Sequence, residues 1–225
     1  MSGASIFVYA RRLLLNHEIL LALFFMFADQ LVFALRASTS SEWAPGIVAH
    51  FGDFLKDHAG AERKAHANCL AILAKYQNRL ELVETMLEVA AEELQHFREV
   101  VGMLHERGLT LAETLIKDVY AERMLGQMRP TSEERLMDRL LIASIIEARG
   151  CERFGLLGAE LLRSGDPKLG EYYTELSRVE ARHYGTYLRL ARLYAPATTV
   201  EARMNELLDV EASLIRDLPV RAALH

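Results

Sequence analysis

From Ile47 onward, apolar residues recur at the spacing of an amphipathic helix almost without interruption. No stretch shows the strict alternation of polar and apolar residues that marks a half-buried strand. The chain has 225 residues, 51% of them hydrophobic and 25% charged, which is enough for one domain with a large core. The sequence therefore predicts an all-α protein.

Turn and capping residues divide this pattern into helices. They are Gly108, the capping pair Thr131 and Glu134, the N-cap and first-turn proline Asp166 and Pro167, and the capping pair Thr198 and Glu201. We expect long helices at 47–77, 79–107, 132–163 and 167–194, a crossover with its own helix at 111–127, and a last helix at 199–217. Two long hairpins joined by one crossover predict a ferritin-like four-helix bundle with additional flanking helices.

The N-terminal region contains an apolar run, Ile19 to Ala28, preceded by Arg11 and Arg12. The run is shorter than the roughly 20 residues that span a bilayer, and no cleavage signal follows it. We expect residues 1–37 to be an N-terminal extension or a packing helix, residues 38–225 to be the bundle domain, and the protein to have no stable membrane association.

Charge and cysteine content narrow the functional classes. Two cysteines, Cys69 and Cys151, cannot form a disulfide framework and indicate a reducing compartment, so we expect a cytoplasmic protein. A net charge of -5 argues against a generally basic coat for nucleic acid, so any RNA contact must be local.

Acidic and imidazole side chains interrupt the apolar stripe of each long helix. A buried carboxylate without a partner is very unfavourable, so four of them in one core require a cation. The residues placed in this way are Glu62 on the first helix, Glu93 and His96 on the second, Glu147 on the third, and Glu180 and His183 on the fourth.

The spacing of these residues repeats in the two halves of the chain. A single Glu-x-x-His match carries little weight, since about one is expected by chance in a chain of this composition. Each match is, however, preceded by a glutamate in an apolar stripe, 31 residues earlier in one half and 33 in the other. Two copies of Glu…Glu-x-x-His are the ligand set of a carboxylate-bridged di-metal site. Oxygen and imidazole ligands without thiolate favour iron or manganese.

The third helix offers a second candidate ligand, Glu152. If the hairpin turns near Gly165, Glu147 lies about 18 residues before the turn and Glu152 about 13, whereas the Glu-x-x-His pair lies about 16 after it. This depth favours Glu147 and leaves Glu152 as a partner of Arg149 or Arg153.

Other side chains lie one helical turn from the expected ligands. Tyr184 and Tyr187 either line a pocket or pack in the core, and we favour packing. His58 and His66 flank Glu62, and we expect one of them to hydrogen-bond to a ligand carboxylate and the other to be solvated.

A row of arginines on the fourth helix is a candidate RNA-binding surface. Such a row either holds phosphates or forms ordinary surface ion pairs with Glu171, Glu175 or Glu152. The arginines are Arg178, Arg182, Arg189 and Arg192.

Four segments together resemble the signature segments of the MiaE family of tRNA hydroxylases. They read DHAGAERKA at 57–65, EELQHF at 92–97, IEARGCERF at 146–154 and EARHY at 180–184. The likeness extends from about Ser38 to Leu218.

This resemblance implies a non-haem di-iron monooxygenase that acts on tRNA. Its substrate would be the isopentenyl group of 2-methylthio-N6-isopentenyladenosine beside the anticodon, hydroxylated to the cis-zeatin form. Two iron ions, O2 and an external electron donor, a reductase or a ferredoxin-like protein, would take part. Two alternatives remain: a quinone-type hydroxylase, and an iron-storage or peroxide-scavenging protein. The rubrerythrin type of scavenger is disfavoured because the chain has no Cys-x-x-Cys motif.

Overall fold

The computed structural model describes residues 35–114 and 117–225, and every regular element in these ranges is a helix. The all-α prediction is therefore confirmed. The helices are α2 (Trp43–Ala49), α3 (Phe51–Lys75), α4 (Leu80–Glu106), α5 (Val119–Leu125), α6 (Ser132–Ser164), α7 (Pro167–Tyr194) and α8 (Ala197–Asp217).

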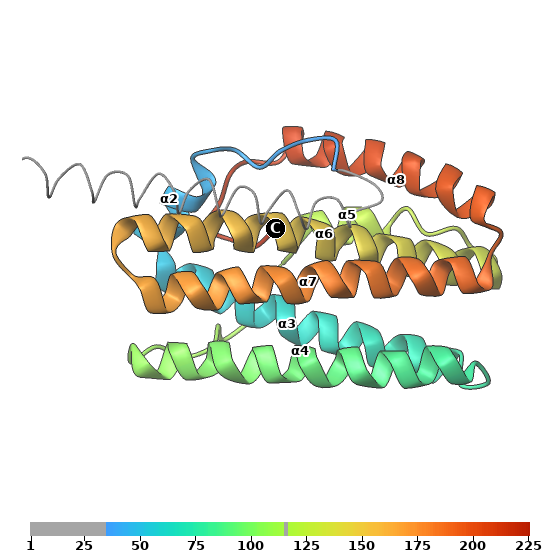
Figure 1. The fold of residues 1–225 in the computed structure, drawn as a ribbon, viewed down its shortest axis with the longest axis horizontal. Helices are drawn as coiled ribbons and strands as arrows, with labels where there is room; N and C mark the ends of the chain where they lie inside the picture. Colours follow the sequence, from blue (N-terminus) through green and yellow to red (C-terminus); the bar gives the residue numbers. More distant parts are fainter. Residues whose placement is uncertain (1–34, 115–116) are drawn as a thin grey trace, which may run out of the picture.

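Four long helices form the bundle, and they are arranged as two antiparallel hairpins (Figure 1). Helices α3 and α4 form one hairpin and α6 and α7 the other, with the two hairpin turns at opposite ends of the bundle. The crossover that contains α5 connects them, and α8 lies along the outside of the second hairpin. The predicted ferritin-like bundle with flanking helices is confirmed.

Most helices begin or end at the capping and turn residues that the sequence predicts. The Asp166 carboxylate accepts a hydrogen bond from the Leu169 amide at 3.1 Å, with Pro167 in the first turn. Gly108 and Gly165 follow the ends of α4 and α6 with positive φ angles of 67° and 92°, which glycine adopts without strain.

Three details differ from the sequence prediction. Thr131 bonds to the Glu134 side chain rather than capping a backbone amide. Helix α8 begins at Ala197, directly after Pro196, so Thr198 lies inside its first turn and is not the cap. The crossover helix is shorter than 111–127, because the Asp118 carboxylate caps α5 by accepting from the Ala121 amide at 2.9 Å.

The helix expected at 47–77 is two helices, separated at His50. The chain turns there, and α2 packs against α6, with Trp43 and Ile47 in one apolar cluster with Phe154. Burial of Trp43, which is 2% exposed, outweighs the local preference for one continuous helix.

Helices α6 and α7 pack together more extensively than any other pair. A Cβ atom at Gly158 would lie only 3.0 Å from the carbonyl oxygen of Gly170. The two backbones approach this closely because neither residue has a side chain, and the spacing of the second hairpin is thereby fixed.

A buried ion pair attaches α8 to the bundle. Arg149 on α6 and Glu211 on α8 are both fully buried, and their side chains meet at 2.8 Å. Such a pair fixes the alignment of two helices, because either partner alone would be a buried charge.

Residues 1–34, which hold most of the expected N-terminal extension or packing helix, lie outside the described residues. Among the described helices, none is both long and apolar enough to cross a membrane. Both cysteines are buried as free thiols.

Candidate metal centre

The six side chains singled out from the sequence meet inside the bundle. They form two groups, and in each group one ligand atom from every residue lies within 4.8 Å of the others. The groups are Glu62, Glu93, His96 and Glu180, and Glu93, Glu147, Glu180 and His183. Glu93 and Glu180 belong to both groups, so the two groups are adjacent and share these carboxylates.

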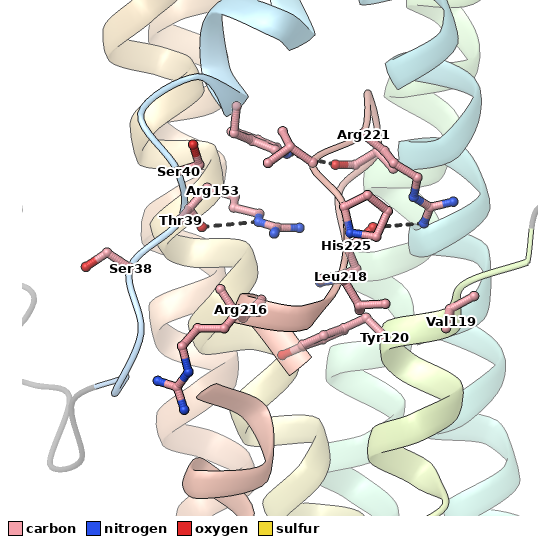
Figure 2. Close-up of a pocket in the computed structure, with 15 residues that line it drawn as sticks. Ser38, Thr39, Ser40, Val119, Tyr120, Arg153, Arg216, Leu218, Arg221 and His225 are labelled. Carbon is pink, nitrogen blue, oxygen red and sulfur yellow. Dashed lines mark hydrogen bonds between the residues drawn. The ribbon is translucent and has the colours of Figure 1, made fainter. Parts of the chain in front are cut away.

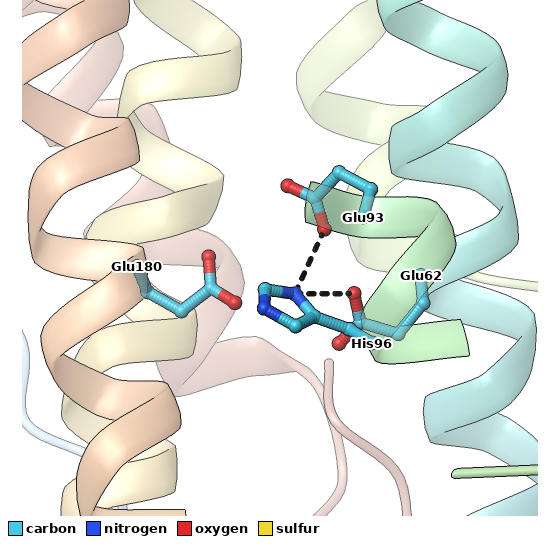
Figure 3. A group of neighbouring side chains, drawn as sticks. All are labelled: Glu62, Glu93, His96 and Glu180. Atoms are coloured by element: carbon cyan, nitrogen blue, oxygen red, sulfur yellow. Dashed lines mark ion pairs between the residues drawn. The ribbon is translucent and has the colours of Figure 1, made fainter. Parts of the chain in front are cut away.

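The first group joins α3, α4 and α7. Figure 3 shows Glu180 reaching from α7 across the bundle toward His96. His96 Nδ1 lies 3.6 Å from an oxygen of Glu62 and 3.5 Å from an oxygen of Glu93. All four side chains are buried.

The second group joins α4, α6 and α7. His183 Nδ1 lies 2.9 Å from Glu93 Oε1 and 3.5 Å from Glu180 Oε2. Glu147 completes the group from α6. Both histidines therefore direct Nδ1 into the cluster.

Four buried polar atoms of the cluster lack a hydrogen bond of normal geometry and meet their neighbours only in ion-pair contacts. They are Glu93 Oε1, His96 Nδ1, Glu180 Oε2 and His183 Nδ1. Buried polar atoms are nearly always satisfied, and leaving one unpaired costs about 1–3 kcal/mol. Inward-facing carboxylate oxygens and imidazole nitrogens would be satisfied by divalent cations, so the residues present fit a di-metal centre.

The electrostatics of the cluster favour cations. Burial raises the pKa of Glu147 well above its usual value, and the Glu180 and Glu93 carboxylates raise it further. Burial lowers the pKa of His96, but the Glu62 and Glu93 carboxylates outweigh this effect and raise the pKa to about 10. Protons therefore balance the charge of the metal-free cluster, and metal binding would release them.

Two hydrogen bonds orient side chains of the candidate ligands from outside the cluster. His183 Nε2 lies 2.9 Å from Oε2 of Glu92, which leaves Nδ1 for the cluster. His58 Nε2 lies 2.6 Å from Glu62 Oε1, and the His58 Nδ1 lies 3.3 Å from the hydroxyl of Tyr173. Burial lowers the pKa of His58 to about 3, so the ring is neutral and its Nε2–H donates to Glu62.

His66 makes a different contact from His58. Its Nδ1 lies 2.7 Å from the backbone oxygen of Ala90 on α4, so the ring is bound to the neighbouring helix rather than solvated. The sequence did not single out Glu92, because Glu92 lies off the apolar stripe and reaches His183 only through the packing of α4 beside α7.

Glu152, the other candidate on α6, lies away from the cluster. Its carboxylate bonds to Arg149 and accepts from the Thr39 hydroxyl at 2.6 Å. Tyr184 and Tyr187 are both at most 2% exposed and pack in the apolar core, with the Tyr187 hydroxyl 3.1 Å from Cys69 Sγ.

The four arginines of α7 have acidic neighbours. The pairs are Arg178 with Glu175, Arg182 with Glu92 at 3.6 Å, Arg189 with Glu81, and Arg192 with Glu201 at 4.0 Å. These pairs are partly or largely exposed, so solvent screens them and phosphate groups can compete for the arginines.

A cavity of about 40 Å³ adjoins the acidic cluster. Glycine at position 150 leaves room there, since a Cβ atom would lie 3.7 Å from Glu180 Cγ. The lining residues are Ala61, Glu62, Ala65, Glu93, Ile146, Glu147, Gly150, Phe154, Glu180 and Leu224.

The fold and this cluster define a class, the ferritin-like bundles with carboxylates and histidines at their centre. The model of one family, "tRNA-(MS[2]IO[6]A)-hydroxylase (MiaE)", matches residues 27–225. The chain therefore belongs to the MiaE family of tRNA hydroxylases, which are oxidoreductases, and the resemblance of the four segments is confirmed.

Two curated relatives carry the name tRNA 2-(methylsulfanyl)-N(6)-isopentenyladenosine(37) hydroxylase. One, from Pseudomonas putida, is 35% identical over 173 residues, which are 77% of this chain and 82% of the relative. The other, from Salmonella typhimurium, is 36% identical over 135 residues, which are 60% of this chain and 48% of that longer relative.

A solved structure is also similar, and it represents a protein with aldehyde deformylating oxygenase activity from Synechococcus. The TM-score is 0.79 at 32% identity, and the match covers 86% of this chain and 96% of that one. The two proteins therefore share the same helical fold over most of the length of both chains.

Proposed function

We propose that this chain hydroxylates the isopentenyl side chain of 2-methylthio-N6-isopentenyladenosine, next to the anticodon of tRNA, to give the cis-zeatin derivative. O2 is the co-substrate, and an external reductase or ferredoxin-like protein supplies two electrons. The observation that carries the proposal is the pair of buried ligand groups that share Glu93 and Glu180, in a chain of the MiaE family.

We propose that the two metal ions are iron, and that Glu62, Glu93, His96, Glu147, Glu180 and His183 would hold them. Four carboxylates balance the charge of two ferrous ions, so the centre is neutral in a low-dielectric core. When bound, a di-iron pair supplies the electrons and the oxidising power that place one oxygen atom of O2 in a C–H bond. Glu92 and His58 hold His183 and Glu62 in position for this centre.

The protein's remaining task is to bring an allylic carbon to the cluster and to exclude water. The surroundings suit the exclusion of water, because the apolar residues Ile146, Phe154 and Leu224 line the cavity beside the cluster. A base in a stacked anticodon loop reaches such a site only after it is splayed out of the loop.

The direct test supplies iron-loaded protein, a chemical reductant and O2 to tRNA that carries the methylthio-isopentenyl nucleoside. Nucleoside mass spectrometry should detect the product with one added oxygen atom, derived from labelled O2. The same tRNA without the isopentenyl group is the control. Full iron loading without product would contradict the proposal. Turnover of a long-chain aldehyde or a quinone instead would indicate another kind of oxygenase. Turnover of peroxide alone would indicate a peroxide-scavenging protein.

We propose that the exposed arginines of α7 contact the tRNA backbone. Replacing Arg182 and Arg189 together with alanine should weaken tRNA binding and reduce the salt slope of log Kd by about 2, because two phosphate contacts are lost. Fluorescence anisotropy over a salt series measures both quantities. Arg163→Ala is the matched control, since Arg163 is also exposed and paired with a glutamate but lies at the far end of α6. An unchanged slope in the double variant would remove these arginines from the interface.

We propose a cytoplasmic location, because the substrate is tRNA and both cysteines are free thiols. The electron donor is then a cytoplasmic reductase or ferredoxin-like protein.

A further inference from the structure

Residues 219–225, here named the closing segment, follow α8 and lie between two cavities. The inner cavity is the one of about 40 Å³ beside the acidic cluster. The outer pocket has a volume of about 290 Å³ and is drawn in Figure 2. Arg153, Arg216, Tyr120 and His225 are among the side chains around it.

Successive residues of the closing segment face different cavities. Ala223 and His225 line the outer pocket, whereas Leu224 lines the inner cavity together with the four glutamates of the cluster. Leu224 is 4% exposed and packs in the apolar cluster that contains Phe154 and Tyr173. The closing segment is therefore the partition between the outer pocket and the metal ligands.

The inner cavity is too small for the proposed substrate while Leu224 is in place. A volume of 40 Å³ accommodates about three water molecules, since each needs about 10–15 Å³ of cavity volume, and it does not accommodate a five-carbon group with the purine base attached to it. An isopentenyl group has five carbon atoms, one more than the leucine side chain. Some part of the wall must therefore move before the reacting carbon reaches the cluster.

The closing segment is the part of the wall held least firmly. Helix α8 ends at Asp217, and the last helical hydrogen bond is the one that the Leu218 amide donates to the Leu214 oxygen, before the closing segment begins. Side chains of the bundle hold Ala223 and Leu224 instead. Trp43 Nε1 donates to the Ala223 oxygen at 3.0 Å, the Leu224 amide donates to Asp57 Oδ2 at 2.7 Å, and Arg153 donates to the Leu224 oxygen.

The helices on the other sides of the cavity are less able to move, because each is packed along its length in the bundle. A segment held by a few side-chain hydrogen bonds opens at much lower free energy than a packed helix. The opening that admits the substrate therefore falls on the closing segment.

We propose that the closing segment is a displaceable partition, and that its movement joins the outer pocket and the inner cavity into one binding site for the modified nucleoside. The isopentenyl group takes the place of Leu224, and the base occupies the outer pocket beside Trp43 and Tyr120. Arg153 and Arg216 then lie near the nucleotide's phosphate groups. This inference rests on the proposed function, since it takes the isopentenyl nucleoside as the substrate.

The first test replaces Leu224 with alanine. The smaller side chain competes less with the isopentenyl group, so the apparent KM for the tRNA should fall about tenfold, with iron content unchanged. The control is Leu161→Ala, because Leu161 is also 4% exposed and belongs to the same apolar cluster but does not line the cavity. An equal KM in parent and Leu224→Ala proteins would overturn the partition.

The second test measures hydrogen exchange in the unaltered, iron-loaded protein without O2, so that no turnover occurs. Binding of tRNA with the isopentenyl nucleoside should speed exchange of the Leu224 amide about tenfold, because its bond to Asp57 is released. tRNA without the isopentenyl group should leave that amide protected.

The outcomes separate this inference from the proposed function. Hydroxylation with unchanged exchange of the closing segment on binding would overturn the partition and leave the function standing. Failure of the iron-loaded parent protein to hydroxylate the tRNA would overturn the function, and the partition with it.

Discussion

Replacing Glu93 with alanine should leave a folded protein that retains neither metal ion and has no detectable hydroxylase activity. Glu93 contributes a carboxylate oxygen to both candidate groups, so its loss would weaken both groups at once. Iron analysis and nucleoside mass spectrometry measure the two effects, and circular dichroism checks the fold. Leu94→Ala is the control, since Leu94 is the next residue of α4 and is 44% exposed.

The two histidines sharpen this prediction, because each belongs to one group alone. His96→Ala and His183→Ala should each retain about one iron per chain, whereas Glu93→Ala retains less. Equal, full iron loading of all three variants would show that the ligand assignment is wrong.

Removing the metal should lower the melting temperature by about 8–16 °C. A ligand held at a thousand times its Kd stabilises the folded state by about 4 kcal/mol, and each kcal/mol shifts the melting temperature of a chain of this size by roughly 2–4 °C. Polar atoms of Glu93, His96, Glu180 and His183 face one another in the core without hydrogen bonds of normal geometry, so the metal-free cluster is an unfavourable arrangement.

Differential scanning calorimetry of the chelated and the reloaded protein measures the shift. Iron added back should restore the original melting temperature, and the effect should grow with iron concentration. A melting temperature that is independent of metal would argue that the cluster is stable with its protons alone.

The sequence was sufficient to predict the long helices and their arrangement. The expected ranges 132–163 and 167–194 differ from α6 and α7 by at most one residue, because Asp166, Pro167 and Gly165 determine the turn locally. The break at His50 was not predictable in this way. It depends on the burial of Trp43 against α6, more than a hundred positions away in the chain.

The candidate ligands were predictable because they lie on apolar stripes of the helices. A charged group buried there is unfavourable unless it has a partner of opposite charge. The helical hairpins bring Glu62 beside His96, and Glu147 beside Glu180, as the repeated spacing predicts. Their binding of metal stays a prediction.

The residues around the ligands could not be predicted, since nothing local distinguishes them. Glu92 is half exposed and resembles any surface glutamate until the bundle brings it to His183. Leu224 is likewise an ordinary leucine in the sequence, and its place beside the cluster arises from long-range hydrogen bonds to Asp57 and Arg153.

Gly150 shows how an absent side chain shapes the interior. Its Cα faces the Glu180 side chain, and even one methyl group at this position would touch Glu180 Cγ. A methyl group would fit in ordinary van der Waals contact, so the width of the inner cavity on the α6 side depends on the size of the residue at position 150. A bundle of the same architecture with a residue larger than alanine at this position would have a narrower inner cavity, and so a different selection of substrates, with all six candidate ligands unchanged.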